Sequence, residues 1–174
     1  MTENNNKTEE YDSKERLSDI ILATGFGAGY WPWGPGTAGA VVATAMWYAL
    51  FCIINDYDAL LCLTLFLIVA FTLLSIKPID RLERHWGEDP KKVVVDEMVG
   101  VWITLLAVPA SCEWYYILLA LLLFRIMDIT KPLGCRWLDR NIHGGWGVML
   151  DDILAGVYGG ILLKIIHLVI VGYA

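Results

Sequence analysis

Long apolar runs separated by short polar links dominate this sequence. The first two runs, residues 37–54 and 59–76, each hold 18 residues without a charged side chain, and only the four residues NDYD separate them. A helix of about 20 apolar residues is long enough to cross the hydrocarbon core of a bilayer. So short a link favours two antiparallel neighbours. The pattern therefore predicts a hairpin of two membrane-spanning helices.

Three further apolar runs follow at residues 93–110, 114–127 and 153–171. The first of these carries two acids near its start, and the other two carry basic residues. This leaves open whether they cross the bilayer, lie shallow in it or pack inside a bundle. Together the five runs predict an all-α integral-membrane bundle with about five apolar helices.

The start of the chain is polar and acidic, and it lacks an apolar core behind a basic beginning. This composition argues against a cleavable signal peptide and predicts a solvated tail. We therefore expect a polar tail over residues 1–19 and a membrane domain over residues 20–174.

Basic residues indicate the orientation of the helices, because Lys and Arg concentrate in short cytoplasmic loops. Twelve of the 13 lie in the tail, in the link after the second run, or around the end of the fourth run. The links at residues 55–58 and 111–113 carry none, and Lys164 is the exception. The sequence therefore predicts a cytoplasmic amino terminus and cytoplasmic longer loops.

Composition supports the membrane prediction. Hydrophobic residues make up 57% of the chain, against roughly 45–50% in ordinary soluble domains. The net charge of −6 argues against a nucleic-acid partner, which calls for clustered basic surface. The four cysteines show no metal-binding spacing. We expect them to be small buried hydrophobes in a reducing compartment.

A glycine- and proline-rich stretch, TGFGAGYWPWGPGTAGA, occupies residues 24–40. Its composition opposes a regular helix and exposes backbone amides just before the first apolar run. Such a loop can hold a phosphate through its N–H groups. A tight turn at the entry to the membrane is an equally good alternative.

Asp96 and Glu97 lie between three valines and a strongly apolar stretch. An uncompensated charge inside a membrane helix costs roughly 2.5–3.5 kcal/mol on insertion scales. The favourable interaction of an acid with the helix dipole contributes only about 0.3–1 kcal/mol. Capping therefore accounts for one of these acids and hardly for two.

Two more charged groups lie at the ends of apolar runs. Arg125, Asp128 and Lys131 recur at three-residue spacing, which places them on one face of a helix. A structural ion-pair cluster is the alternative reading of this group. Asp151 and Asp152 are expected at the start of the last helix, where a simple N-cap is the alternative.

The predicted topology brings all five of these carboxylates to one membrane surface. Oxygen ligands with almost no histidine suit a hard cation such as Mg²⁺ rather than zinc. The neighbouring Arg125, Lys131 and Arg140 can hold phosphate oxygens. A cation site beside basic residues at the water–lipid boundary indicates phosphoryl chemistry on a lipid headgroup.

The sequence lacks the motifs of phosphatases that form a covalent intermediate. It has no Cys-x5-Arg site and no D-x-D-x-[TV] motif, and its three histidines are scattered. We expect His85 and His143 to be surface residues. The absences favour hydrolysis by metal-activated water.

Four stretches, in order, resemble the phosphatidylglycerophosphatase A family: GFGAGYWPWGPGTAGA, DPKKVVVDEMVG, FRIMDITKPLG and GGWGVMLDDILAG. They cover about a third of the chain and span residues 25–156. Each stretch alone is weakly specific, whereas four of them in this order and spacing are specific.

The resemblance implies an all-helical, Mg²⁺-dependent enzyme of the bacterial inner membrane with its active site facing the cytoplasm. Such an enzyme converts phosphatidylglycerophosphate to phosphatidylglycerol in phospholipid biosynthesis. By the same resemblance the metal site comprises Asp96, Glu97, Asp128, Asp151 and Asp152. The substrate would be bound by Gly34, Gly36, Thr37, Arg125, Lys131 and Arg140. Trp31 and Trp33 replace less bulky residues in the loop, which leaves the route of lipid entry open.

Other functions are weaker on the sequence alone. A phosphoalcohol transferase would need a D-G-x2-A-R motif, which is missing. A small transporter or assembly subunit would use the carboxylates to bind ions, but it would place them deep in several helices. The sequence predicts no oligomeric state.

Overall fold

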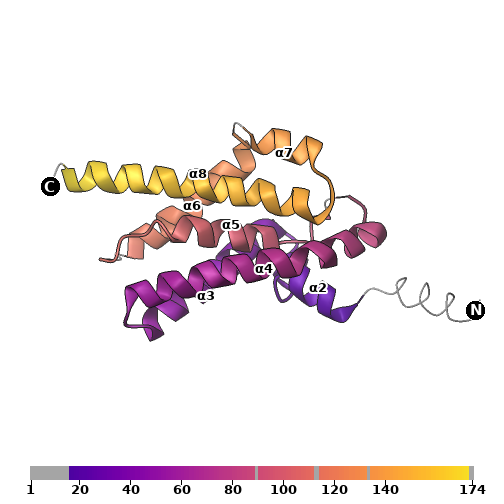
Figure 1. Ribbon diagram of the computed structural model, residues 1–174, viewed down its shortest axis with the longest axis horizontal. Helices are drawn as coiled ribbons and strands as arrows, with labels where there is room; N and C mark the ends of the chain where they lie inside the picture. The colour runs from indigo at the N-terminus through magenta and orange to yellow at the C-terminus, as the bar shows by residue number, and fades with distance from the viewer. Residues whose placement is uncertain (1–15, 89, 112–113, 133, 173–174) are drawn as a thin grey trace, which may run out of the picture.

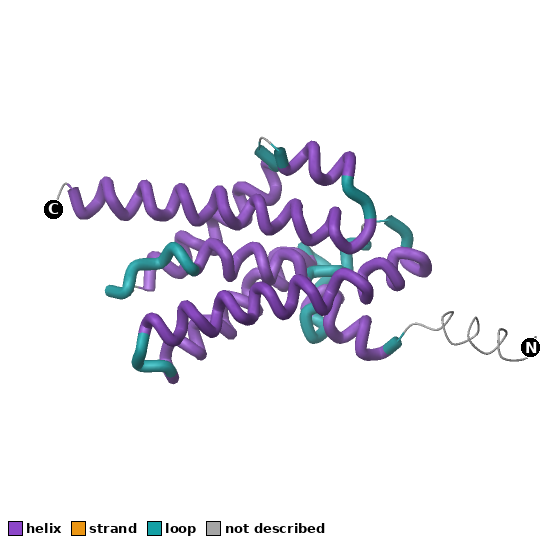
Figure 2. The backbone as a smooth tube through the Cα atoms, in the orientation of Figure 1, coloured by secondary structure: helices purple, strands orange, loops and turns teal. Residues whose placement is uncertain are grey.

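The structure is a computed structural model that describes residues 16–88, 90–111, 114–132 and 134–172. Of residues 136, 139 and 140 it describes only the backbone. Most of the expected tail and Cys112 lie outside the described residues. Within these ranges all regular structure is helical and no strand occurs (Figure 2). The expected all-α class is confirmed.

Seven α-helices and one short 3-10 helix follow one another along the described chain (Figure 1). They are α2 (Leu17–Ala23), η1 (Ala28–Tyr30), α3 (Pro35–Ile53), α4 (Tyr57–Trp86), α5 (Val95–Leu105), α6 (Trp114–Thr130), α7 (Cys135–Asn141) and α8 (Gly144–Gly172). The longer helices run along the long axis of the molecule, and α2 lies at the end opposite the last turns of α8.

Helix α5 is the centre of the bundle, because it packs against α3, α4, α6 and α8. Nine of its 11 residues are buried, from Val95 to Leu105. Its apolar side chains therefore contact protein on every side, which explains why this short run lacks a polar face. Trp102 donates a hydrogen bond from its ring nitrogen to the Ala43 carbonyl at 2.9 Å, which fixes α5 against α3.

Glycines bring the backbones of α5 and α8 into direct contact. A Cβ atom on Gly156 would lie 2.3 Å from the carbonyl oxygen of Gly100, and one on Gly100 would lie 2.7 Å from the carbonyl oxygen of Asp152. Small residues permit this close approach of two helices. The expected packing role of the small residues in the last helix is confirmed at Gly156. The contact also sets the position of Asp152 relative to the start of α5.

Three helices, α3, α4 and α8, are long and apolar enough to cross a membrane. Helix α5 has 11 residues and α6 has 17, and neither is among these three. The apolar runs at residues 37–54 and 59–76 form the expected antiparallel pair, α3 and α4. A total of about five spanning helices, and the cytoplasmic side, stay predictions.

Two helices are longer than their apolar runs. Helix α4 continues to Trp86 through Pro78, and α8 begins at Gly144, nine residues before the expected start. The early glycines of α8 pack against backbone rather than forming a turn, since a Cβ on Gly145 would lie 2.3 Å from the Ile76 carbonyl oxygen. Asp80 accepts a hydrogen bond from the Gly145 N–H at 2.7 Å, which satisfies one of the N–H groups that have no partner within the first turn of the helix. The N-cap alternative for Asp151 and Asp152 is therefore wrong, because both lie well inside α8.

Smaller corrections concern the glycine-rich stretch and the cysteines. The stretch at residues 24–40 is not loop throughout, because α3 already begins at Pro35, a residue favoured in the first helical turn. Cys135 is buried as expected, whereas Cys52 and Cys62 are exposed on the outer faces of α3 and α4. On a lipid-facing helix an exposed small apolar side chain carries no penalty.

Helix α2 crosses the expected boundary between residues 19 and 20. The buried Asp19 carboxylate accepts two hydrogen bonds from Arg81 of α4, at 2.6 and 2.8 Å. Such bidentate pairs are among the stronger polar contacts in proteins. The division into a tail and a membrane domain stays a prediction, but the part of the chain fixed to the bundle begins by Leu17.

We expect Arg81→Ala to release α2 from α4, because it leaves the Asp19 carboxylate buried without its two donors. Limited trypsin digestion of the purified protein should cleave after Arg16 at least several-fold faster than in the wild type. Lys77→Ala, which removes an exposed cation from the same helix, is the control and should cleave at the wild-type rate. Equal cleavage rates in the two variants would contradict an anchoring role for this ion pair.

Candidate active site

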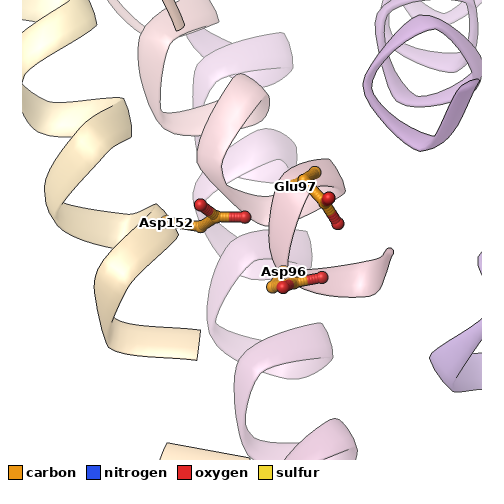
Figure 3. A group of neighbouring side chains, drawn as sticks. All are labelled: Asp96, Glu97 and Asp152. Carbon is orange, nitrogen blue, oxygen red and sulfur yellow. The ribbon is translucent and has the colours of Figure 1, made fainter. Parts of the chain in front are cut away.

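Three carboxyl groups from two helices meet at one point (Figure 3). Asp96 and Glu97 come from the first turn of α5, and Asp152 projects toward them from α8. One oxygen from each lies within 4.8 Å of the other two. Oxygens this close can share a single hard cation or a bridging water. The expected meeting of acids that are remote in sequence is therefore found for these three.

The start of α5 is held firmly, which fixes two of the three carboxyl groups. The Val94 N–H donates a hydrogen bond to the Ala23 carbonyl at 2.8 Å, and Val93, Val94 and Val95 are buried. Asp96 and Glu97 then occupy the first helical turn, where the helix dipole favours negative charge. The three valines are therefore the structural support of the acidic pair.

Arg125 and Asp128 form the next part of the site. The Arg125 Nη1 atom lies 2.5 Å from an Asp128 carboxylate oxygen and 3.9 Å from Glu97 Oε1. The carboxyl groups of Asp128 and Asp152 are close enough to share a hydrogen bond. The expected face of α6 is therefore confirmed for this pair, and it faces the three-carboxylate cluster.

Lys131 lies beyond the helix that carries Arg125 and Asp128. It follows the last residue of α6 and has a φ of 43°, in the left-handed region, so the helical spacing no longer applies to it. Its Nζ atom lies 2.6 Å from a carboxylate oxygen of Asp151, on a different helix. The expectation of a single Arg125–Asp128–Lys131 stripe is wrong, and the reason is that α6 ends at Thr130.

A cavity of about 490 Å³ joins these groups. All five expected carboxylates line it, together with Arg125 and Lys131. Two acids that the sequence did not indicate, Glu83 and Glu88, also line the cavity. His143 is exposed as expected, and it lines the cavity as well. Seven carboxylates against two permanent cations make the cavity strongly electronegative. Glu83 could have been found had the helix been extended past Pro78, since it lies in the continuation of α4.

The electrostatics of Glu97 indicate that the site is short of positive charge. Burial raises the pKa of the Glu97 carboxyl group well above its usual range, and the nearby Asp96, Asp152 and Asp128 raise it further. Its Oε2 atom is buried and accepts no hydrogen bond from any described residue. A buried acceptor without a donor is costly, and a cation would remove both penalties. The donor set, made only of oxygens, fits Mg²⁺.

The glycine-rich stretch at residues 24–40 reaches the site at Gly36, in the first turn of α3. A Cβ atom on Gly36 would lie 2.0 Å from Glu97 Oε1 and 3.2 Å from Arg125 Nη1. Gly34 precedes α3 with a φ of +91°, which favours glycine, and Thr37 is exposed. None of these three residues lines the cavity itself. The side chain of Arg140 lies outside the described part of the chain.

Cys135 is the one described cysteine near the acids. Burial raises the pKa of its thiol to about 11, and the charges of Asp151 and Asp152 add to this effect. The thiol is therefore neutral at physiological pH, whereas a nucleophilic cysteine needs a thiolate. Cys135 is therefore unsuited to act as a nucleophile.

Comparison with known proteins assigns the chain to a family. Residues 21–167 match the sequence profile of the phosphatidylglycerophosphatase A family. Phosphatidylglycerophosphatase A of Escherichia coli is 39% identical over 149 residues, covering 84% of this chain and 83% of that protein. The Haemophilus influenzae protein of the same name is 35% identical over 143 residues, covering 82% and 85%.

A third relative carries a different name. A Bacteroides thetaiotaomicron protein, provisionally named a phosphatidylinositol-3-phosphatase, is 53% identical over 152 residues, covering 87% of this chain and 94% of that protein. No solved structure matches the chain significantly. The profile match extends over all the site residues described above, from the loop before α3 to the acids of α8. The chain therefore belongs to the phosphatidylglycerophosphatase A family.

Proposed function

We propose that this protein is a Mg²⁺-dependent lipid phosphatase that hydrolyses phosphatidylglycerophosphate to phosphatidylglycerol and phosphate. The observation that carries the proposal is the convergence of Asp96, Glu97 and Asp152 within 4.8 Å, in a cavity that Arg125 and Lys131 also line. Two relatives named phosphatidylglycerophosphatase A support the substrate. Ion transport, the alternative from the sequence, gains no support from these relatives.

Asp96, Glu97 and Asp152 would hold the cation, and Asp128 and Asp151 would support it from either side. A bound Mg²⁺ supplies charge to phosphate oxygens and lowers the pKa of a bound water. Arg125 forms an ion pair with Asp128, and Lys131 forms one with Asp151. These ion pairs hold both basic side chains at fixed places on the cavity wall. From there both can hold phosphate oxygens by charge-assisted hydrogen bonds.

The reaction needs only water as the second substrate. The water oxygen forms a bond to phosphorus while the bond from phosphorus to the glycerol oxygen breaks. One proton of the water ends on the glycerol oxygen, and the other stays on the released phosphate. Carboxylates that are not bound to the cation are the candidates to accept the first proton. Asp128 is one such group, since its carboxyl group is close enough to that of Asp152 to share a hydrogen bond.

We further propose that the protein spans the bacterial inner membrane several times and that the cavity faces the cytoplasm. Three candidate spans support the membrane location. The concentration of 12 of 13 cations near the predicted cytoplasmic loops supports the orientation. Lys131 and Glu88, which lie in the connecting segments on that predicted side, both line the cavity. This location would supply phosphatidylglycerol to phospholipid biosynthesis.

A second candidate substrate is phosphatidylinositol 3-phosphate. It rests on the 53% identical relative whose provisional name specifies that lipid. Both substrates are phosphomonoesters of a polyol on a diacylglycerol lipid, so one site could serve either. The acidic cluster does not distinguish them, because it would contact only the phosphate.

The deciding experiment is a phosphate-release assay with the purified full chain in detergent micelles. Phosphatidylglycerophosphate, phosphatidylinositol 3-phosphate and phosphatidic acid are compared, each with Mg²⁺ and with EDTA. We expect the highest kcat/KM with phosphatidylglycerophosphate and a loss of activity in EDTA that added Mg²⁺ restores. If none of the three lipids is hydrolysed, the proposed phosphatase function is rejected. Full activity in EDTA would reject the proposed dependence on a divalent cation.

We expect Cys135→Ala to keep phosphatase activity within a few-fold of the wild type. The thiol is neutral and buried, so it supplies no nucleophile, and alanine leaves only a small cavity. Steady-state kinetics on phosphatidylglycerophosphate measure this directly. A loss of activity by several orders of magnitude in a folded variant would point to a covalent cysteine intermediate instead.

A further inference from the structure

A second cavity, of about 300 Å³, lies between α3 and α6 on the outer face of the bundle. Its walls are apolar: Val41 and Tyr48 mark its two ends on α3, and Leu121, Leu118 and Trp114 follow one another on α6. Thr44, its one hydroxyl besides that of Tyr48, donates to the Ala40 carbonyl of its own helix at 2.8 Å. This groove therefore offers an apolar surface to a ligand.

The two walls of the groove lead directly into the candidate active site. On α6, Leu121 precedes Arg125 by four residues, so both lie on the same helix face. On α3, Val41 follows Thr37 by the same interval. Arg125 lines the acidic cavity, and Gly36, next to Thr37, lies against Glu97. One end of the groove is thus one helical turn from the carboxylate cluster.

The distance from the acidic cavity to the far end of the groove suits a lipid tail. Arg125 and Trp114 are 11 residues apart on α6, which at 1.5 Å per residue corresponds to about 16 Å. One leaflet contributes half of a hydrocarbon core about 30 Å thick. A chain that enters at Arg125 would therefore reach Trp114 near the middle of the bilayer.

We infer that the groove between α3 and α6 binds an acyl chain of the lipid substrate while the phosphate occupies the acidic cavity. This inference rests on the proposed lipid phosphatase function and adds a binding site for the tail. The groove holds the chain in line with the membrane normal, with Thr37 and Arg125 at its polar end. The site then recognises its substrate as a lipid through α3 and α6 and as a phosphomonoester through α5 and α8.

A matched pair of variants on α6 tests the assignment. Leu118 lines the groove and Leu122 does not, and their exposed fractions are nearly equal, 55% and 56%. Leu118→Phe should narrow the groove, whereas Leu122→Phe should add the same bulk to an ordinary lipid-facing surface. For each protein, kcat/KM is measured with dioleoyl and with dibutyryl phosphatidylglycerophosphate, and the ratio of the two values is compared.

We expect Leu118→Phe to lower this ratio about tenfold, because a filled apolar pocket discriminates by roughly this factor. Leu122→Phe should keep the wild-type ratio. On the opposite wall, Val41→Phe should lower the ratio as well, with Val69→Phe of α4 as its control; these valines are 47% and 50% exposed.

The outcomes separate the groove from the proposed function. If the wild type hydrolyses both lipids and neither Leu118→Phe nor Val41→Phe lowers the ratio, the groove assignment is overturned and the phosphatase stands. An equal fall of the ratio in the control variants would overturn it too. If the wild type hydrolyses neither lipid, the proposed function fails and the acyl-chain site fails with it.

Discussion

Asp152→Asn is expected to lower phosphate release from phosphatidylglycerophosphate by about a thousandfold while the protein still inserts and folds. The substitution keeps the size of the side chain but removes one of three charges that lie within 4.8 Å of one another. The cation would lose both a ligand and part of the negative charge that attracts it. Steady-state kinetics at saturating Mg²⁺ measure the effect on turnover.

Stability in the absence of the cation gives a second readout for the same variant. Without a cation, Asp152 lies beside Asp96 and Asp128 and is repelled by both, so removing one charge relieves repulsion. We therefore expect Asp152→Asn to melt at a higher temperature than the wild type in EDTA. In Mg²⁺ the order should reverse, because only the wild type gains from tight cation binding.

Asp58→Asn is the matched control. Asp58 is exposed in the first turn of α4, at the end of that helix remote from the cavity. It should keep wild-type activity and the wild-type response of the melting temperature to Mg²⁺. Full activity of Asp152→Asn, with a melting temperature that still rises in Mg²⁺, would show that Asp152 is not a ligand of the cation.

Gly36→Ala is expected to reduce kcat/KM about a hundredfold without a comparable loss of stability. The new methyl group would lie 2.0 Å from Glu97 Oε1, so that carboxylate must move. Because this oxygen is the end of a flexible side chain, the fold can adapt to the change. A displacement of about 1 Å at a catalytic group is enough for a loss of this size. Kinetics and thermal unfolding of the same sample separate the two effects.

Two other glycine variants serve as controls, one expected to be tolerated and one expected to unfold the protein. Gly160→Ala, whose Cβ would meet Ala107 at an ordinary 3.5 Å, should be fully active and slightly more stable, since alanine favours a helix. Gly156→Ala should unfold the protein, because its Cβ would lie 2.3 Å from the Gly100 backbone. A Gly36→Ala protein as active as Gly160→Ala would show that the first turn of α3 has no part in positioning Glu97.

The sequence predicted the acids better than it predicted the helices that carry them. Asp96 and Glu97 are detectable because two charges in an apolar run need compensation. The positions where helices begin and end were harder to predict from the sequence. Glycines at the start of α8 suggest a turn by composition, but Gly145 packs tightly on the Ile76 backbone. That packing is a tertiary contact, and local propensity cannot report it.

The ion pairs of Arg125 and Lys131 also show which contacts the sequence can predict and which it cannot. The pairing of Arg125 with Asp128 is local, at three residues along one helix, so spacing alone predicts it. The pairing of Lys131 with Asp151 joins residues 20 positions apart, and it depends on where α6 ends. Glu88 and His143 lie in connecting segments, where periodicity gives no direction for a side chain. Only the assembled fold brings them to the cavity.

The contact between Gly100 and Gly156 divides the molecule into a part that tolerates change and a part that does not. Any side chain at that crossing would shift α8 against α5 and separate the acids each helix carries. Mutational drift is thus restricted on one side of the cavity. Helices α3 and α6 have no such crossing at their shared groove, so residues there can vary in size while hydrolysis is retained. Under the acyl-chain proposal, variants with altered groove residues would differ in the lipid tails they accept while keeping the same acidic site.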